Sequence, residues 1–157
     1  MISNFPTPKN YNLGGLSNFQ FAPAEAFSVF SGVFNGRILF PLVLNTGFDW
    51  FKGYSTAYTL GFNETLKTSE HGKYYEQTIT GFVPGDRAEL INLMETMDDR
   101  YFVLQVKDAN GVSRLVGGFG CPMLFSSNYD SGLARSDGKG YQFQFFCQST
   151  FRAPVYL

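Results

Sequence analysis

The chain has 157 residues, of which 44% are hydrophobic and only 16% are charged. A chain of this length fits one domain and can bury a core without disulfides or a structural metal. Its 12 Lys and Arg against 13 Asp and Glu argue against a sequence-specific nucleic-acid binder, because neutralising phosphates requires a basic excess or a basic run.

Phenylalanine and glycine are unusually frequent, with 18 and 17 copies. Aromatic residues favour pleated sheets and glycine favours turns, whereas helical bundles are rich in Leu, Ala and charged helix formers. We therefore expect a mainly β (α+β) fold: a β-sandwich or barrel of antiparallel strands flanked by one α-helix.

Residues 1–28 are predicted to form an irregular, aromatic and proline-rich arm, because Pro and Gly interrupt them too often for a long helix. The arm docks either on its own domain or on a neighbouring copy. Residues 29–157 then form a single β-rich domain. The chain begins without the apolar stretch of a signal peptide, and its longest apolar run, "ILFPLVL", is too short to span a bilayer, so we expect synthesis in the cytoplasm.

Strand patterns begin at residue 29. The apolar runs "FSVFSGVF" and "RILFPLVL" flank Asn35-Gly36, a pair that accepts the positive φ angles of a tight hairpin turn. Residues 55–63 and 73–83 are predicted as further strands. In the second of these, alternation places Gln77 and Ile79 on one face.

One helix is predicted, over about residues 86–99. Asp86 is a suitable N-cap, and Glu89 three residues later completes a box-like start. Four apolar residues recur at helical spacing, and a stripe of this kind packs on a core more often than it forms a binding groove. The stripe consists of Leu90, Leu93, Met94 and Met97.

The second half of the chain returns to strand patterns. Residues 101–107 and 112–116 flank another Asn-Gly pair and predict a hairpin, and a further strand runs from residue 122 into a turn. Cys121 and Cys147 are expected to be reduced thiols on two strands. In the last strand an aromatic face points to the core and a glutamine face points away from it. The core-facing residues are Tyr141, Phe143, Phe145, Cys147 and Ser149.

Residues that commonly carry catalysis or bind metals do not form a recognisable site. His71 is the only histidine and lies in a predicted loop, and neither CxxC nor HExxH occurs. Asp98-Asp99 are expected at a solvated helix end, and "GGFG" at 117–120 does not match a nucleotide motif, so a bulge or close packing explains its glycines. We predict no catalytic, cofactor-binding or metal-binding residues, no cofactor, and no enzymatic activity.

Three features carry a resemblance to a known family: the "RYFVLQVKDANG" hairpin, the "YDSG" turn and the "DGKGYQFQF…APVYL" ending. Over about residues 63–157 the chain resembles small structural proteins, tail-associated and tail-tube-like, that are encoded by phages and prophages of Bacteroidetes-type bacteria. The resemblance implies a β-sandwich or barrel whose loops and termini join copies into rings. It also implies a virion location where the prophage is functional. The sequence does not reveal a long hairpin that would stack one ring on the next.

The principal hypothesis is therefore a non-enzymatic, phage-derived virion protein that self-assembles, or docks on other virion proteins, through its arms and sheet edges. We expect no membrane partner. The residues predicted to anchor the assembly are Phe19, Phe21, Phe151, Pro154, Val155 and Tyr156.

The alternative hypothesis is a β domain that binds a small molecule or a glycan in an aromatic pocket around Trp50. The pocket would be lined by Trp50, Phe51, Tyr54 and Tyr58. Oligomerisation would favour the first hypothesis, and a ligand that quenches the single tryptophan would favour the second.

Overall fold

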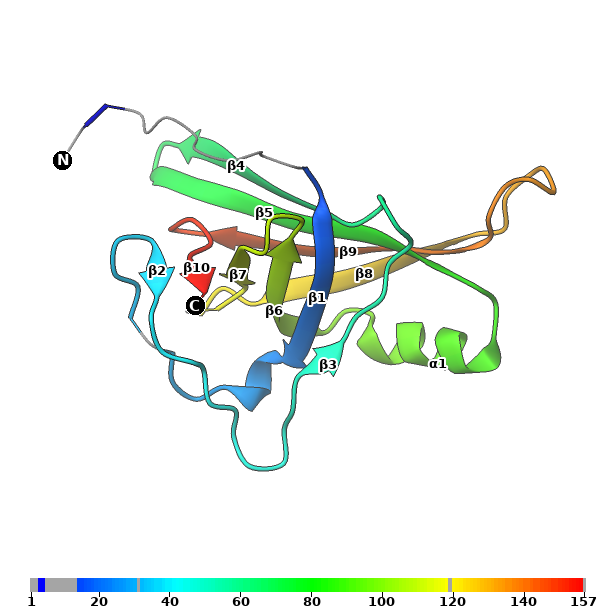
Figure 1. The fold of residues 1–157 in the computed structure, drawn as a ribbon, viewed down its shortest axis with the longest axis horizontal. Helices are drawn as coiled ribbons and strands as arrows, with labels where there is room; N and C mark the ends of the chain where they lie inside the picture. The colour runs from blue at the N-terminus through cyan, green and yellow to red at the C-terminus, as the bar shows by residue number, and fades with distance from the viewer. Residues whose placement is uncertain (1–2, 5–13, 31, 119, 157) are drawn as a thin grey trace.

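The computed structural model describes residues 3–4, 14–30, 32–118 and 120–156 (Figure 1). Strands dominate the described chain, and one α-helix packs beside them. In chain order the elements are β1 (Leu16–Pro23), the 3₁₀ turn η1 (Ala24–Ala26), β2 (Arg37–Ile38), β3 (Phe51–Lys52), β4 (Gly61–Ser69), β5 (Gly72–Pro84), α1 (Ala88–Met97), β6 (Tyr101–Asp108), β7 (Ser113–Val116), β8 (Met123–Asp130), β9 (Gly140–Ser149) and β10 (Val155–Tyr156).

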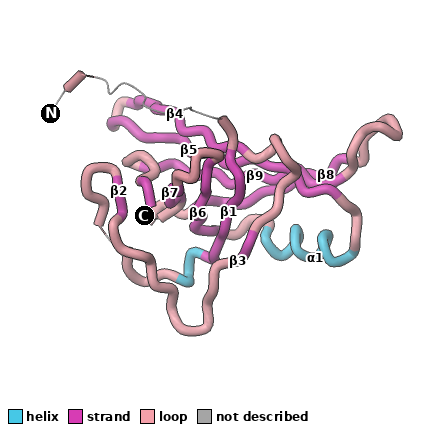
Figure 2. The backbone as a smooth tube through the Cα atoms, in the orientation of Figure 1, coloured by secondary structure: helices cyan, strands magenta, loops and turns pink. Residues whose placement is uncertain are grey.

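The described strands form one ten-stranded sheet with the order β2-β10-β7-β6-β8-β9-β5-β4; off this path, β1 pairs with β6 and β3 pairs with β1. β6 is the branch point, because β1 pairs along one side of it while β8 and β7 share the other. The pairings are antiparallel apart from β10 with β2. The sheet curls into a half-barrel (Figure 2), and the mainly β fold with one flanking helix is confirmed.

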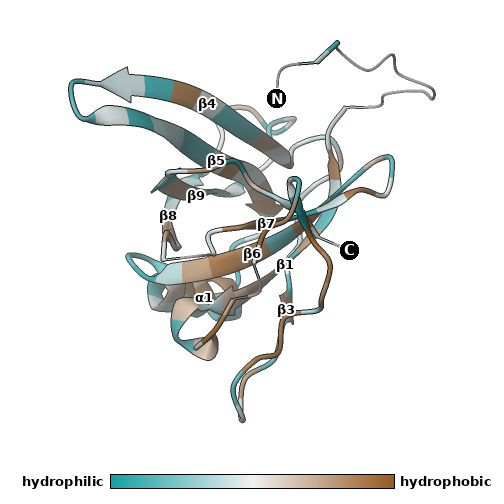
Figure 3. Ribbon diagram, turned by 90° about the vertical axis from the view of Figure 1, so that its left-hand side faces the viewer, coloured by the Kyte–Doolittle hydropathy of each residue, from teal (hydrophilic) through white to brown (hydrophobic). Residues whose placement is uncertain are grey.

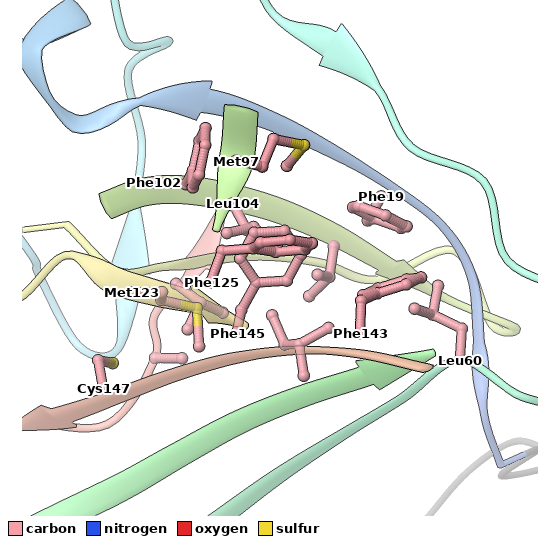
Figure 4. Close-up of a cluster of buried hydrophobic side chains, with 14 of the residues drawn as sticks. Phe19, Leu60, Met97, Phe102, Leu104, Met123, Phe125, Phe143, Phe145 and Cys147 are labelled. Atoms are coloured by element: carbon pink, nitrogen blue, oxygen red, sulfur yellow. The ribbon is translucent and has the colours of Figure 1, made fainter. Parts of the chain in front are cut away.

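The core fills the inside of the half-barrel with aromatic rings. Phe125, Phe143 and Phe145 come from β8 and β9, and Phe19 and Phe102 face them from β1 and β6 (Figure 4). The Phe125 and Phe145 rings are 4.9 Å apart in an edge-to-face arrangement, which is favourable for aromatic pairs. A second, smaller cluster lies on the other side of β1 and β6 and consists of Ala22, Ala26, Phe27, Ile38, Leu42, Val103, Leu115 and Tyr156.

The predicted irregular arm over residues 1–28 is wrong for the segment Leu16–Pro23, which is strand β1. This strand pairs with β6 along its length, and Phe19 is a core residue. Glycine and proline flank the segment but do not interrupt it, so the alternation between them can form a strand. After β1, residues 24–28 of the predicted arm include the turn η1 and the buried Ala26 and Phe27, whereas residues 1–2 and 5–13 lie outside the described residues.

The first Asn-Gly turn is confirmed, but the long strands predicted on either side of it are not. Asn35 and Gly36 have φ angles of 48° and 74°, and Phe34 bridges to Arg37 across them. Beyond the turn, however, only β2 pairs with the sheet. The connection from β2 to β3 runs outside the half-barrel (Figure 1).

The strand predicted at residues 55–63 lies instead at β4, six residues later. Residues 55–60, the first half of the predicted strand, form coil and turns beside β5. There Thr56 N–H donates to Phe82 O at 2.9 Å, and Phe82 N–H donates to the Ser55 hydroxyl at 3.0 Å. These bonds satisfy the backbone of β5 where β4 has not yet begun, which is why the strand starts late.

Helix α1 is shorter than predicted and its N-cap is Arg87, whose side chain makes no capping hydrogen bond. Asp86, the predicted cap, pairs with Lys139 at 3.4 Å instead. Of the predicted stripe, Met94 and Met97 are buried in the core, and Leu93 is 46% exposed. The helix therefore contributes the end of its stripe to the core from one side of the half-barrel.

The alternation predicted for β9 is confirmed. Phe143, Phe145 and Cys147 are buried, while Gln142 and Gln144 between them are exposed. The alternation predicted for β5 also holds, because Gln77 and Ile79, which share one face of the strand, are both buried.

Candidate functional site

A run of exposed apolar side chains lies on the segment around β2, and we call it the apolar loop surface. Phe34, Phe40 and Val43 are 68%, 69% and 82% exposed. The members of this surface among the described residues are Val29, Val33, Phe34, Leu39, Phe40 and Val43. Contiguous exposed apolar patches commonly mark interaction sites, and the six exposed apolar side chains within the described residues of 29–43 make this segment the candidate.

The local sequence explains this exposure. Phe27, Ile38 and Leu42 of the same segment are buried in the second core cluster. Because only two residues of β2 pair with the sheet, the segment touches the core at intervals and its remaining apolar residues face outward. Sequence reasoning missed this surface because it assigned both apolar runs to strands, in which they would have been buried.

The sheet has open edges at which another strand can pair. β4 is the last strand of the main path, and its nine residues pair with β5 on one side only. The outer half of the β4–β5 hairpin projects from the body of the domain and is mainly hydrophilic (Figure 3). An unpaired edge of this length offers main-chain hydrogen bonds to a neighbour.

The C-terminal residues predicted as assembly anchors serve the domain itself. Tyr156 is buried, and its hydroxyl accepts a 2.7 Å hydrogen bond from Leu42 N–H. Pro154 is buried and Val155 is partly buried in β10, which inserts between β7 and β2. Phe151 is the exception, at 42% exposure. The prediction is corrected to this extent: the chain end completes its own sheet through β10, with Tyr156 in the second core cluster and Ala153 in the first.

The two N-terminal anchors are placed in the same way. Phe19 is buried, and Phe21 packs against the first core cluster from the same face of β1. Phe19 is enclosed by its own domain, whereas Phe21 keeps a partly exposed ring.

The four residues of the predicted aromatic pocket do not come together. Trp50 packs against the Phe27 ring, with centroids 5.5 Å apart, and Phe51 lies on the exposed strand β3. Tyr54 lines a separate cavity beside α1, and Tyr58 is fully exposed at a positive φ of 65°. Trp50 precedes β3 and packs on the second core cluster, whereas Phe51 in β3 lies beside Phe21 of the first.

One polar cluster combines a thiol, an amide, a carboxylate and a guanidinium. The Cys147 thiol donates to Gln77 Oε1 at 3.2 Å, and Gln77 Nε2 donates to Glu64 at 2.7 Å. Glu64 also accepts from Ala153 N–H at 2.7 Å and from Arg152 at 3.0 Å. Burial raises the pKa of Cys147 to about 12, so the thiol is protonated at neutral pH and is a poor nucleophile. The cluster ties the chain end to the β4–β5 hairpin.

The remaining candidates for chemistry are dispersed. His71 is exposed in the turn between β4 and β5, and Asp98 accepts a hydrogen bond from the Ser127 hydroxyl at 2.7 Å. Within the described residues no three His, Cys, Asp or Glu side chains gather in a way that could hold a metal ion. No helix of the described chain has the length and apolar character needed to cross a membrane.

A shallow groove of about 600 Å³ lies over β5, β9 and β8, and neutral polar side chains such as Asn128, Gln142 and Gln144 line it. The lining also includes the hydroxyls of Thr59, Thr80, Ser126 and Ser127, and it contains no charged side chain.

Comparison of the chain with protein-family models, with curated proteins and with solved structures finds no match.

Proposed function

We propose that the chain is a non-enzymatic structural subunit of a phage-derived virion, associated with the tail, which assembles with further copies or with other virion proteins. The observation that carries the proposal is the apolar loop surface, where Phe34, Phe40 and Val43 stand in solvent on a chain of low charge. Covering these side chains removes apolar area from water, which favours association. A net charge of −1 opposes it little.

The open sheet edges support the same role. β4 offers a long unpaired edge at one end of the sheet, and the apolar loop surface lies beside β2 at the other. A strand of one copy placed against the opposite end of the next makes a head-to-tail contact. Contacts of this type close into rings when the rotation allows it.

The hairpin formed by β8 and β9 adds a feature that the sequence did not reveal. Its connection, residues 131–139, projects beyond the sheet at the end opposite β2 and β10 (Figure 1). A projecting hairpin of this kind suits contacts between successive rings, as the resemblance to tail-tube-like proteins implies.

Light scattering on a size-exclusion column tests the proposal. We expect the full chain to form oligomers that grow with concentration, and the double variant Phe34→Ser, Phe40→Ser to elute as a monomer with an unchanged circular dichroism spectrum. The matched control is Tyr58→Ser, Val112→Ser, which removes exposed apolar side chains elsewhere and should leave the oligomer intact. Electron microscopy of the oligomer should show rings or tubes.

Two results would contradict the proposal. One is a full chain that stays monomeric at high micromolar concentration, alone and with other proteins of the same prophage. The other is equal loss of the oligomer in both double variants.

A further inference from the structure

An apolar cavity of about 150 Å³ lies between α1 and the aromatic core. Phe19, Phe143 and Phe145 line it from the sheet, and Met94 and Met97 line it from the helix. Figure 4 shows the rings of Phe19 and Phe143 and the side chain of Met97 around the same part of the core. The cavity is open to solvent, and both α1 and the segment Lys52–Tyr54 contribute to its lining.

This space is a recess open to solvent and not a sealed void of the core, since exposed residues such as Tyr54 and Leu93 belong to its lining. Water gains little here because the wall is almost entirely hydrocarbon, and an apolar cavity of roughly 150 Å³ can take up a molecule the size of benzene. The volume therefore suits one aromatic ring or a short alkyl chain.

The mouth of the cavity carries one charge. Lys52 is the only Lys, Arg, His, Asp or Glu among the lining residues, and it lies in the exposed strand β3 next to Gly53. Its ammonium forms no ion pair within the described part of the chain. Tyr54 and Leu93, both exposed, border the same opening.

We propose that this cavity is a binding site for a small anionic amphiphile, such as an aryl or short-chain alkyl carboxylate. The apolar part occupies the space between α1 and the phenylalanine rings, and the carboxylate lies at the mouth beside Lys52. A positive group at the rim of a hydrocarbon-lined pocket selects a ligand with one apolar end and one anionic end. The site does not depend on the assembly role, since it involves none of the apolar loop surface.

Calorimetric titration of the full chain with 3-phenylpropionate, and separately with the cation 3-phenylpropylamine, tests this assignment. We expect the carboxylate to bind with a dissociation constant of roughly 0.1–1 mM, given the ligand's size. The amine should bind about two- to fivefold more weakly, the range of an exposed charge pair. Lys52→Glu should reverse that preference, and Lys67→Glu on the exposed strand β4 is the matched charge control.

Leu93→Trp should close the mouth and weaken binding at least tenfold. Leu66→Trp is its matched control, because Leu66 is 47% exposed against 46% for Leu93 but lies away from the cavity. If Leu93→Trp does not fold, as judged by circular dichroism, the Lys52→Glu reversal decides the matter alone, since that side chain is exposed on an edge strand.

Three outcomes overturn the proposal: no heat of binding for the carboxylate at 10 mM or more, binding that Leu93→Trp and Leu66→Trp reduce equally, or binding without any preference for the anion. A change in oligomeric state on Leu93→Trp alone would also overturn it, because the cavity would then receive a side chain of a second copy.

Discussion

The Cys147 thiol shows how strongly the fold changes the chemistry of a single side chain. Burial raises its pKa to about 12 from an ordinary value of 9.0, and the nearby Cys121 and Glu64 add smaller contributions. The neutral thiol donates a hydrogen bond to Gln77. At the residue scale, this group is a packing element rather than a reagent.

Thiol labelling checks this description. A Cys121→Ala variant, whose single thiol is Cys147, should react with a disulfide reagent at pH 8 only when denaturant is added. The Cys147→Ala variant retains the partly exposed Cys121 and should react within minutes in the folded state. Rapid labelling of folded Cys121→Ala would contradict the prediction.

The same pKa predicts a dependence of stability on pH. Because the thiol ionises near 9.0 when unfolded and near 12 when folded, its contribution is fully present below pH 9 and is lost as the pH rises toward 12. Urea melts should therefore show the free energy of unfolding falling across this range. The fall should be smaller in Cys147→Ala than in the wild type.

Glu64 is the centre of the hydrogen bonds that hold the chain end. Its side chain is 10% exposed and accepts from Gln77, Arg152 and Ala153 N–H. Glu64→Gln keeps the shape but replaces one accepting oxygen with a donor, and we expect a loss of about 1–3 kcal/mol in urea denaturation. Glu70→Gln, in the exposed hairpin turn, should change the stability by less than about 0.5 kcal/mol.

A comparison of Gly117 with Gly120 distinguishes two reasons why a position requires glycine: a positive φ angle and a lack of space for a Cβ atom. Their φ angles are 85° and 81°, but a Cβ at Gly117 would lie 2.7 Å from Met123 Cγ and 2.9 Å from Phe102 O, whereas one at Gly120 would meet nothing within 4 Å. Both alanine variants carry the cost of a left-handed conformation, about 1 kcal/mol. Gly117→Ala should lower the melting temperature by clearly more than Gly120→Ala, and equal losses would show that close packing does not matter there.

At the scale of elements, α1 begins without a side-chain cap. Arg87 has the extended φ and ψ of an N-cap, −86° and 149°, but makes no capping hydrogen bond. Arg87→Ser should supply the missing acceptor and stabilise the fold by about 0.5–1 kcal/mol relative to Arg87→Ala. Comparing the two variants in denaturant removes the shared effect of losing a cation at a helix N-terminus. A Ser variant no more stable than the Ala variant would refute the prediction.

The elements that could be predicted are those whose pattern is local. The period of two in β9, the turn at Asn110-Gly111 and the core-facing Met94 and Met97 follow from spacing alone. The position of β4 could not be predicted, because residues 55–60 have strand-like composition but bond to Phe82 across the sheet. In such segments the hydrogen-bond partner in the folded chain, rather than the local sequence, decides whether a strand or a turn forms.

At the scale of the whole molecule, the C-terminus is part of the core. A chain ending at Ser149 loses the buried Ala153 and Tyr156 together with β10, which joins β7 to β2. We expect this truncation to cost at least about 3 kcal/mol, comparable to removing a large buried side chain. Thermal denaturation followed by circular dichroism checks it, and a truncated chain as stable as the full one would contradict the placement of the tail.

Composition and short periodic patterns were enough to predict the mainly β class, the single helix, the two Asn-Gly turns, the alternating faces of β5 and the inward face of β9. The burial of Phe19 and Tyr156 and the exposure of Phe34 and Phe40 depend on how the strands pair in the folded chain, and local patterns do not predict them. The same was true of the cavity beside α1. All of these residues are apolar, and an apolar residue favours burial without specifying whether its own domain, a ligand or a neighbouring molecule provides it.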